Sequence, residues 1–429
     1  MSDTEANAPV DYPPGFRTDP YPAYADMRQD GAACHVREPN GLRHWLVVRY
    51  DSAQGVLDDN TSFSKDPRRF WDQLRDAGYV TAPQPDENDY IFHLINTDPP
   101  DHTRLRSLVS KAFTVRRVER LRPMIERIAH GAIDAIAGRG EADLIRDYAH
   151  PVPSTVICEL LGVPQGHRDD FRLWSTAMLT GPEVTDAPMT RQEGNRLMRA
   201  FLTELLERKA ATLDAALPPE EQPDLLSALI VARDGESRLS QRELLAMAEL
   251  LLGAGQEPTV NLIANGVLAL LRAPEQRALL AERPELITSA VEEFLRLDAP
   301  VHQATLRVAV RDVDLDGVRV PAGSVVTVAL GSAGHDPARF TAPEQLDITR
   351  AGPAHLAFGH GIHYCVGAPL ARLEGQVAVD TLLRRLGDLA LAVPEDALRW
   401  RDTRIMRGLT ALPVTFTPVP TRAQTGESE

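Results

Sequence analysis

The stretch Phe358-Gly-His-Gly-Ile-His-Tyr-Cys365-Val-Gly-Ala-Pro-Leu-Ala-Arg372 decides how this chain is interpreted. Two glycines precede its cysteine, and a third follows at close spacing. Glycine permits tight turns and a close approach of the backbone to a flat ligand. An apolar helical run begins just after the cysteine, so we expect Cys365 at a helix N-terminus. Backbone N–H groups there favour the thiolate over the thiol.

Three other interpretations compete for this cysteine. Most lone cysteines are ordinary buried thiols. His360, His363 and Cys365, with His355 upstream, also resemble a set of zinc ligands, although such crowded spacing suits tetrahedral geometry poorly. A reactive nucleophile with a histidine base is the third. Taken alone, the cysteine favours the structural role, and only the surrounding pattern reverses that preference.

The composition narrows the class of protein. The 429 residues are 43% hydrophobic and 25% charged, which is typical of a packed globular protein. A net charge of -15 argues against nucleic-acid binding. We detect no signal peptide and no stretch long enough for a membrane helix. The 3 cysteines, Cys34, Cys158 and Cys365, are too few for a disulfide framework, so we expect a reduced, cytoplasmic protein without membrane contact.

The chain reads as one catalytic domain over residues 16–418, between a flexible N-terminus (1–15) and a flexible tail (419–429). HWLVVRY around Trp45 predicts a strand, and helical periodicity dominates from about His102 to Leu297. Residues 303–330 predict a patch of sheet, helix returns after Pro369, and RGLTALPVTF predicts a final strand. A helix over residues 240–271 would be about 45 Å long. The fold class is therefore mostly α with small β-sheets.

Phe-Gly-x-Gly-x-His-x-Cys-x-Gly resembles the haem-binding loop of cytochromes P450, and the resemblance extends from Asp19 to Phe416. It implies the P450 fold, a triangular prism with a long central I helix. It also implies haem b, with the Cys365 thiolate bound to iron and favouring O–O cleavage. Phe358 would pack beside the ligand, while Gly359 and Gly367 let backbone amides approach the sulfur. The sequence as a whole is similar to those of actinobacterial members that tailor macrolides and other polyketides.

Further motifs support the same resemblance. Glu293-Phe-Leu-Arg296 matches the family's Glu-x-x-Arg, and residues at i and i+3 can pair on a helix. Without the resemblance, a surface ion pair of little value would be the better interpretation. With it, Glu293 and Arg296 are expected to be buried and joined by Arg350.

The two propionates of haem require cations, because buried unpaired carboxylates are costly. The resemblance assigns them to His102 and Arg106 in the C-helix motif, to Arg307, and to His363. Individually, each of these four side chains is expected to be a solvated charge.

One departure from the family concerns the distal side of the haem. The family pattern is Ala-Gly-x-(Asp/Glu)-Thr, whereas this chain has Ala254-Gly255-Gln256-Glu257-Pro258-Thr259. Proline thus occupies the threonine position, and Thr259 lies about 100° further round the helix, so we expect it to point elsewhere. Proline inside a helix costs about 3 kcal/mol and leaves the Ala254 carbonyl without its helical partner.

Four interpretations of this departure remain open. A substrate hydroxyl or an ordered water replaces the missing donor, with Glu257 still in the proton relay. In the second interpretation, the enzyme carries out a less usual oxidation, such as coupling or bridge formation. In the third, it uses peroxide in place of reduced dioxygen. In the fourth, the proline is neutral drift in an ordinary hydroxylase.

By the same resemblance, an aromatic-bearing B–C loop covers the substrate, although many loops bury aromatics only for packing. The candidate pocket residues are Phe70, Trp71, Tyr79, Tyr90, Phe92, Met178, Leu179, the stretch Val301 to Thr305 with Gln303 in it, Ile405 and Met406. A pocket of this kind suits a large, mostly apolar small molecule.

The chain contains no reductase motif, so its electrons are expected from a ferredoxin and a ferredoxin reductase. A basic patch would steer an acidic ferredoxin, the alternative being a solvated helix face. Its members are Arg104, Lys111, Arg116, Arg117 and Arg120. The expected function is hydroxylation or epoxidation of a polyketide-like metabolite with O2. The alternatives are coupling without oxygen insertion, and a haem-thiolate protein that only binds a ligand.

Overall fold

The computed structural model describes residues 8–80, 82–86, 91–179, 189–232 and 235–420. The α-helices are α1 (Tyr21–Asp30), α2 (Tyr50–Asp58), α3 (Trp71–Asp76), α4 (Asp101–Ala112), α5 (Val115–Glu119), α6 (Arg122–Asp134), α7 (Pro151–Leu161), α8 (Arg168–Leu179), α9 (Arg191–Thr212), α10 (Leu225–Val231), α11 (Gln241–Arg272), α12 (Pro274–Glu282), α13 (Ile287–Leu297), α14 (Leu330–Gly334) and α15 (Ala368–Arg385). The prediction of a mostly helical chain is confirmed.

The strands form small sheets. They are β1 (Val10–Asp11), β2 (Ala33–Arg37), β3 (Arg43–Val47), β4 (Phe63–Ser64), β5 (Glu141–Asp143), β6 (Arg307–Ala309), β7 (Val313–Leu315), β8 (Val318–Val320), β9 (Val325–Val328), β10 (Ala390–Leu391) and β11 (Pro413–Thr415). Their orders are β1-β2-β3-β9-β6-β4, β10-β11-β5 and β7-β8. The strand expected around Trp45 is β3, the sheet patch expected over residues 303–330 holds β6 to β9, and β11 occupies only the end of RGLTALPVTF.

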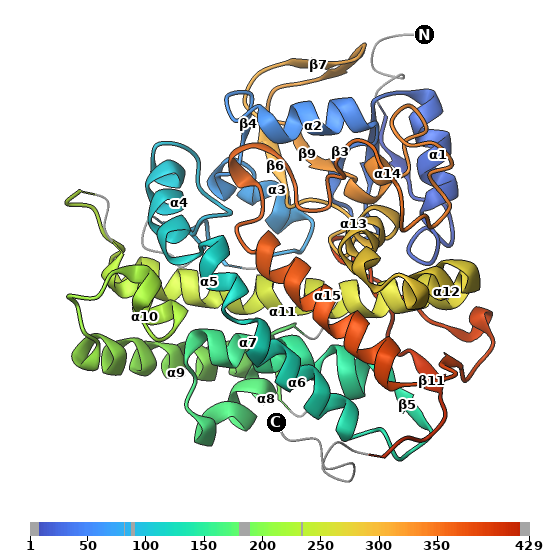
Figure 1. The fold of residues 1–429 in the computed structure, drawn as a ribbon. Helices are drawn as coiled ribbons and strands as arrows, with labels where there is room; N and C mark the ends of the chain where they lie inside the picture. Colours follow the sequence, from blue (N-terminus) through green and yellow to red (C-terminus); the bar gives the residue numbers. More distant parts are fainter. Residues whose placement is uncertain (1–7, 81, 87–90, 180–188, 233–234, 421–429) are drawn as a thin grey trace.

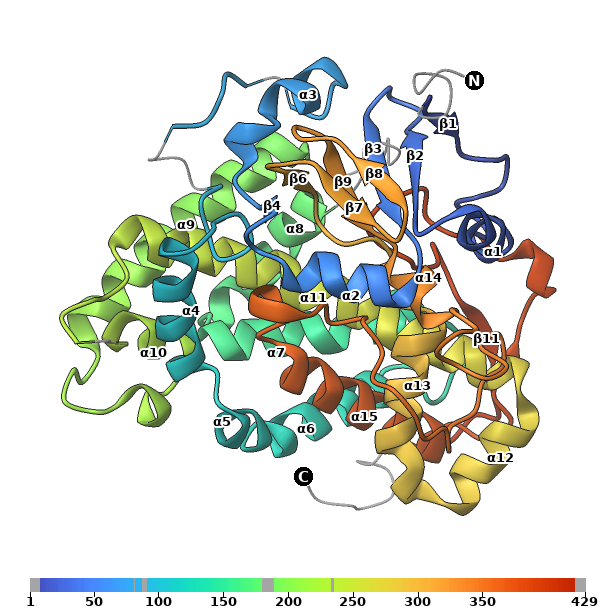
Figure 2. The same ribbon diagram turned by 90° about the horizontal axis from the view of Figure 1, so that it is seen from above.

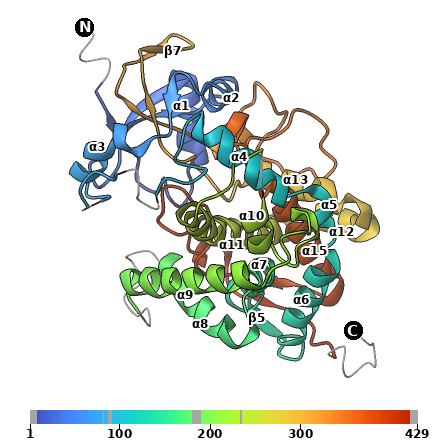
Figure 3. The same ribbon diagram turned by 90° about the vertical axis from the view of Figure 1, so that its left-hand side faces the viewer.

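Helix α11 is the central element of the fold. Ser240 caps it: its hydroxyl accepts from the Glu243 N–H, while the Glu243 carboxylate accepts from the Ser240 N–H. The helix runs for 32 residues without a break at Pro258. It crosses the molecule behind α15 in Figure 1 and is seen nearly along its axis in Figure 3. The long helix expected over residues 240–271 is therefore confirmed.

The largest hydrophobic core surrounds α11, which packs against α7, α9, α13 and α15. The approach to α13 is close, because a Cβ added at Gly266 would lie 2.6 Å from the Phe294 ring. The strands β3, β6 and β9 of the six-stranded sheet lie beside α2 and above α11 in Figure 1, and Figure 2 shows the same fold from above. The site described below lies where α11 faces α15.

Backbone hydrogen bonds reach into both segments that were expected to be flexible. Val10 and Asp11 form β1, paired in parallel with β2, although a flexible segment was expected through residue 15. The Val419 N–H donates to the Ala137 carbonyl at 2.9 Å, although a flexible tail was expected from residue 419. Short terminal sequences do not reveal backbone pairing of this kind.

Candidate active site

A cavity of about 310 Å³ lies between α11 and the loop that carries Cys365. One face of α11 lines it, at steps of three and four residues, through Met247, Leu250, Leu251, Ala254, Gly255, Pro258, Thr259 and Leu262. The cysteine loop (residues 358–367) lines it from the other side, together with the first turns of α15. The packing of α11 against α15 holds these two sides together.

The cysteine loop needs glycine at two positions. Gly359 and Gly361 have φ angles of 73° and 67°, which side chains other than glycine rarely adopt. A Cβ at Gly361 would also lie 2.8 Å from the Leu57 carbonyl oxygen in α2. The Cys365 N–H donates to the Phe358 carbonyl at 2.9 Å, and α15 begins at Ala368. Cys365 therefore lies just before a helix N-terminus, as the sequence predicts.

The thiol of Cys365 faces opposing influences. Burial raises its pKa, whereas the N–H groups of Gly367 and Ala368 and the charge of Arg106 act in the opposite direction. The other two cysteines, Cys34 and Cys158, do not line the cavity. Of the three thiols, only Cys365 is placed to bind a group inside it.

The zinc hypothesis finds no support. His355 lies 3.2 Å from a carboxylate oxygen of Glu292, which also accepts from Arg372. Within the described residues, no three His, Cys, Asp or Glu side chains are gathered as metal ligands. The nearby histidines therefore have other roles.

The four side chains expected to bind propionates all line the cavity: His102, Arg106, Arg307 and His363. The imidazole rings of His102 and His363 lie 4.3 Å apart, and the Nε2 atom of each is buried without a hydrogen-bond partner. Burial lowers the pKa of Arg307 to about 10. Because buried polar atoms are nearly always paired, this set requires an acceptor-rich ligand.

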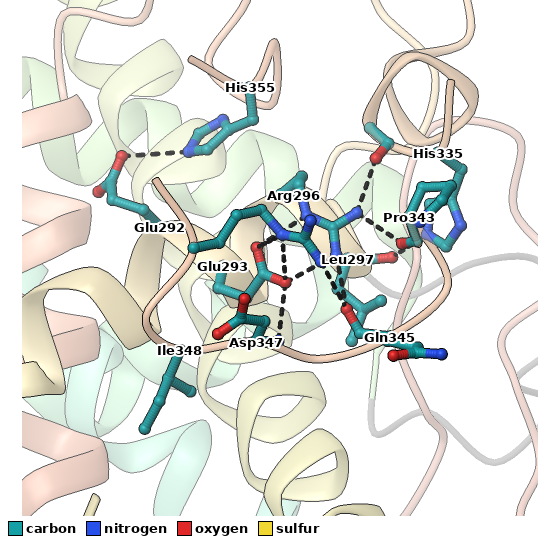
Figure 4. A network of polar contacts seen from close by, with 12 residues as sticks. Glu292, Glu293, Arg296, Leu297, His335, Pro343, Gln345, Asp347, Ile348 and His355 are labelled. Atoms are coloured by element: carbon teal, nitrogen blue, oxygen red, sulfur yellow. Dashed lines mark hydrogen bonds and ion pairs between the residues drawn. The ribbon is translucent and has the colours of Figure 1, made fainter. Parts of the chain in front are cut away.

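The expected ion-pair network is present and buried. Arg296 donates to both carboxylate oxygens of Glu293, at 2.7 and 2.8 Å, and the side chains are only 2% and 3% exposed. Arg350 donates to the same carboxylate at 3.0 and 3.1 Å. Arg296 also reaches the carbonyls of Pro343 and Gln345, and the Asp347 N–H donates to Glu293, as Figure 4 shows. The network ties α13 to the segment that precedes the cysteine loop.

The distal residues differ from expectation at Thr259. It lines the same cavity as Pro258, and its hydroxyl donates to the Gly255 carbonyl at 3.2 Å. The expectation that it points elsewhere was wrong, because a step of 100° still leaves neighbouring residues on one broad helix face. Ala254 and Gly255 line the cavity as predicted.

Glu257 does not line the cavity. Its carboxylate accepts from Arg401 at 2.8 Å, on another side of α11, beside His150 and Gln256. Glu257 therefore lies away from the cavity, whereas the hypothesis that it takes part in the proton relay requires it to face the cavity.

Of the candidate pocket residues, Val301, Ala304, Thr305, Ile405 and Met406 line the cavity. Phe70 instead packs against Val308 and Val325, and Trp71 donates to the Ala82 carbonyl at 3.2 Å. Four further candidates do not line the cavity. Tyr79 is 43% exposed, and Phe92 packs under Arg68. Met178 packs on the main core, and Gln303 is fully buried beside Tyr24. Tyr90 and the side chain of Leu179 lie outside the described residues. The packing alternative holds for the aromatic residues 70, 71 and 92.

Sequence reasoning missed several lining residues, chiefly Lys65, Leu94, Ile95, Met247, Leu250, Leu251 and Glu374. Following the helical periodicity from Ala254 towards the N-terminus would have identified Met247, Leu250 and Leu251 on α11. Glu374 is fully buried, its Oε2 has no hydrogen-bond partner, and burial raises its pKa to about 8. Nothing in its local sequence marked it.

The residues present fit haem b. A cysteine thiol at a helix N-terminus provides a thiolate ligand, and unpartnered His102 and His363 beside two arginines provide for two carboxylates. These features define a haem-thiolate protein.

The comparisons with known proteins agree. A cytochrome P450 family model matches residues 187–387. Cytochrome P450 monooxygenase PikC of Streptomyces venezuelae is 46% identical over 402 residues, covering 93% of this chain and 91% of that protein. Mycinamicin IV hydroxylase/epoxidase of Micromonospora griseorubida is 42% identical over 395 residues, covering 92% and 94%. The structure of ligand-free P450 monooxygenase TamI matches with a TM-score of 0.85 and 40% identity, covering 96% and 95%.

This chain belongs to the cytochrome P450 family. It is a P450 monooxygenase with haem b as its cofactor. When bound, the haem supplies the oxygen-activating chemistry, since the thiolate donates electron density that favours O–O cleavage. Among the described residues, no helix is long and apolar enough to span a membrane.

Proposed function

We propose that this P450 hydroxylates or epoxidises a neutral, polyketide-like secondary metabolite. The observation that carries the proposal is the apolar lining of the cavity on the α11 side. It consists of Leu94, Ile95, Met247, Leu250, Leu251, Val301, Ala304, Ile405 and Met406. Such a lining favours a large apolar ligand held by few polar contacts. The names of relatives such as mycinamicin IV hydroxylase/epoxidase support this class of substrate.

A spin-state titration followed by turnover tests the substrate class. Neutral macrolide polyketides should shift the haem spin state and yield a product heavier by one oxygen atom, with a surrogate ferredoxin and ferredoxin reductase. Long-chain fatty acids are the matched comparison. A response to fatty acids alone would contradict the proposal.

The same assay separates the two alternatives to oxygen insertion. A product that has lost hydrogen without gaining oxygen identifies oxidative coupling or bridge formation. Tight binding without any product, although the haem is reduced, identifies a ligand-binding protein.

We propose that the electrons come from an acidic ferredoxin that binds beside α5. Helix α5 packs against α15, the helix that follows Cys365. Arg116 in α5 and Arg120 just after it are exposed, as is Lys111 at the end of α4. Two members of the expected patch are engaged elsewhere: Arg104 pairs with Glu243, and Arg117 is buried and donates to the carbonyls of two residues of the 219–222 segment. The proposal rests on the exposed Arg116 and Arg120.

A further inference from the structure

Lys65 is a buried lysine at the edge of the haem cavity. It directly follows β4, which pairs with β6 so that Ser64 lies opposite Val308. Continuing that antiparallel register places Lys65 opposite Arg307. Both residues line the cavity, and they are only 2% and 4% exposed. Two cations are thus held side by side, out of water.

The Lys65 ammonium lacks a matching anion among the described residues. Its Nζ donates to the Thr305 hydroxyl and, at 2.8 Å, to the Leu306 carbonyl, both neutral. The nearby carboxylate of Asp98 accepts instead from the Lys65 backbone N–H and from the Ser64 hydroxyl. An ammonium has three donors, so one remains for a group in the cavity.

The single carboxylate of Asp98 leaves an excess positive charge on these two buried cations, which is unfavourable. Burial, and next the charge of Arg307, lower the pKa of Lys65 well below its usual range, with Asp98 opposing. Removing charge from water costs several kcal/mol unless an opposite charge compensates. A carboxylate ligand would stabilise both Lys65 and Arg307.

We propose that the Lys65 ammonium binds a carboxylate of the haem, alongside Arg307. The proposal rests on the haem cofactor and on no assumption about the substrate. Lys65 adds to the four propionate residues expected from the family pattern, and it comes from a different element, the end of β4.

The test compares Lys65→Met with wild type as holoenzymes, and Arg43→Met is the matched control at an exposed cation in β3. Haem transfer to excess apomyoglobin should be about tenfold faster for Lys65→Met, the effect of losing one charge-assisted hydrogen bond. The propionate bending bands in the resonance Raman spectrum should shift in Lys65→Met and remain unchanged in Arg43→Met.

Unchanged haem release, or faster release with unshifted propionate bands, would overturn the proposal, because a purely structural role for Lys65 leaves the propionates undisturbed. If Lys65→Met does not fold, Lys65→Gln and Lys65→Arg decide. Retention of haem by the arginine variant but not by the glutamine variant supports the charge, whereas equal behaviour of the two contradicts it. Failure of the substrate proposal would leave these results unaffected.

Discussion

Pro258 distinguishes this chain from its family pattern at the scale of a single residue. It lines the cavity beside Ala254 and removes the hydroxyl that the family places there. Thr259 lines the same cavity and retains a hydroxyl, which donates to the Gly255 carbonyl and can still accept from water. Glu257 is paired with Arg401 instead. Thr259 is therefore the polar side chain on this face of α11 nearest to the missing position.

Exchanging the two positions tests which hydroxyl matters. If Thr259 has taken over the missing role, Thr259→Val should lower the fraction of NADPH electrons that reach product by about tenfold, the value of one hydrogen bond of 1.4 kcal/mol. Thr259→Ser is the matched control and should keep most of that fraction. Pro258→Thr should then restore part of the loss when combined with Thr259→Val. Unchanged coupling and product profile in Pro258→Thr and Thr259→Val would show that neither position shapes the chemistry.

Glu374 should make stability depend on pH. Its pKa of about 8 in the folded chain lies above the unfolded value near 4.5, so the folded state binds the extra proton. Its contribution is then fully present below pH 4.5 and lost as the pH rises towards 8. Glu374→Gln should stabilise the protein at pH 8 by up to about 5 kcal/mol and leave it unchanged near pH 4.5. Urea unfolding at the two pH values measures this difference, and an equal effect at both would contradict it.

At the scale of elements, the network around Glu293 joins α13 to the segment before the cysteine loop. A single carboxylate accepts from Arg296, Arg350 and a backbone N–H. Glu293→Gln should cost about 3–5 kcal/mol, because it leaves buried arginines without their anion. The matched control is Glu119→Gln, which removes a solvent-exposed i,i+3 pair with Arg122. That change should cost less than about 1 kcal/mol in the same urea unfolding experiment.

Similar losses in the two variants would contradict the structural role given to this network. If Glu293→Gln does not fold, Arg350→Lys offers a milder change, since it keeps the charge but loses the planar guanidinium geometry.

At the scale of the whole molecule, the proposed ferredoxin site consists of exposed cations on an overall acidic protein. Arg116→Glu with Arg120→Glu should slow haem reduction by ferredoxin at least tenfold at low salt, because oppositely charged patches steer association. Rising salt should slow haem reduction in the wild type, so that its rate approaches that of the double variant. Arg43→Glu, an exposed change in β3, is the matched control. A double variant that is reduced at the wild-type rate would place the ferredoxin elsewhere.

The sequence predicted the parts of the fold that depend on local patterns. The long helix α11, the position of Cys365 before α15, and the pairing of Glu293 with Arg296 all follow from residues close together in the chain. The long-range contacts were not readable in this way. Arg401 pairs with Glu257 across 144 residues, and Lys65 meets Arg307 only through the pairing of β4 with β6.

The aromatic segment shows the same limit. Residues 70 and 71 were expected in the substrate pocket because of their type, yet both are buried in packing outside the cavity. Composition identifies residues that leave water, but not which apolar surface they meet.

The central claim is that Cys365 provides the thiolate ligand of the haem iron. The reduced, CO-bound wild-type enzyme should show the strongly red-shifted Soret band of thiolate-ligated haem. Cys365→Ser should lose that band, while Cys158→Ser, a buried cysteine in α7 that does not line the cavity, should keep it. A Cys365→Ser enzyme that binds haem and retains the red-shifted band would contradict the claim.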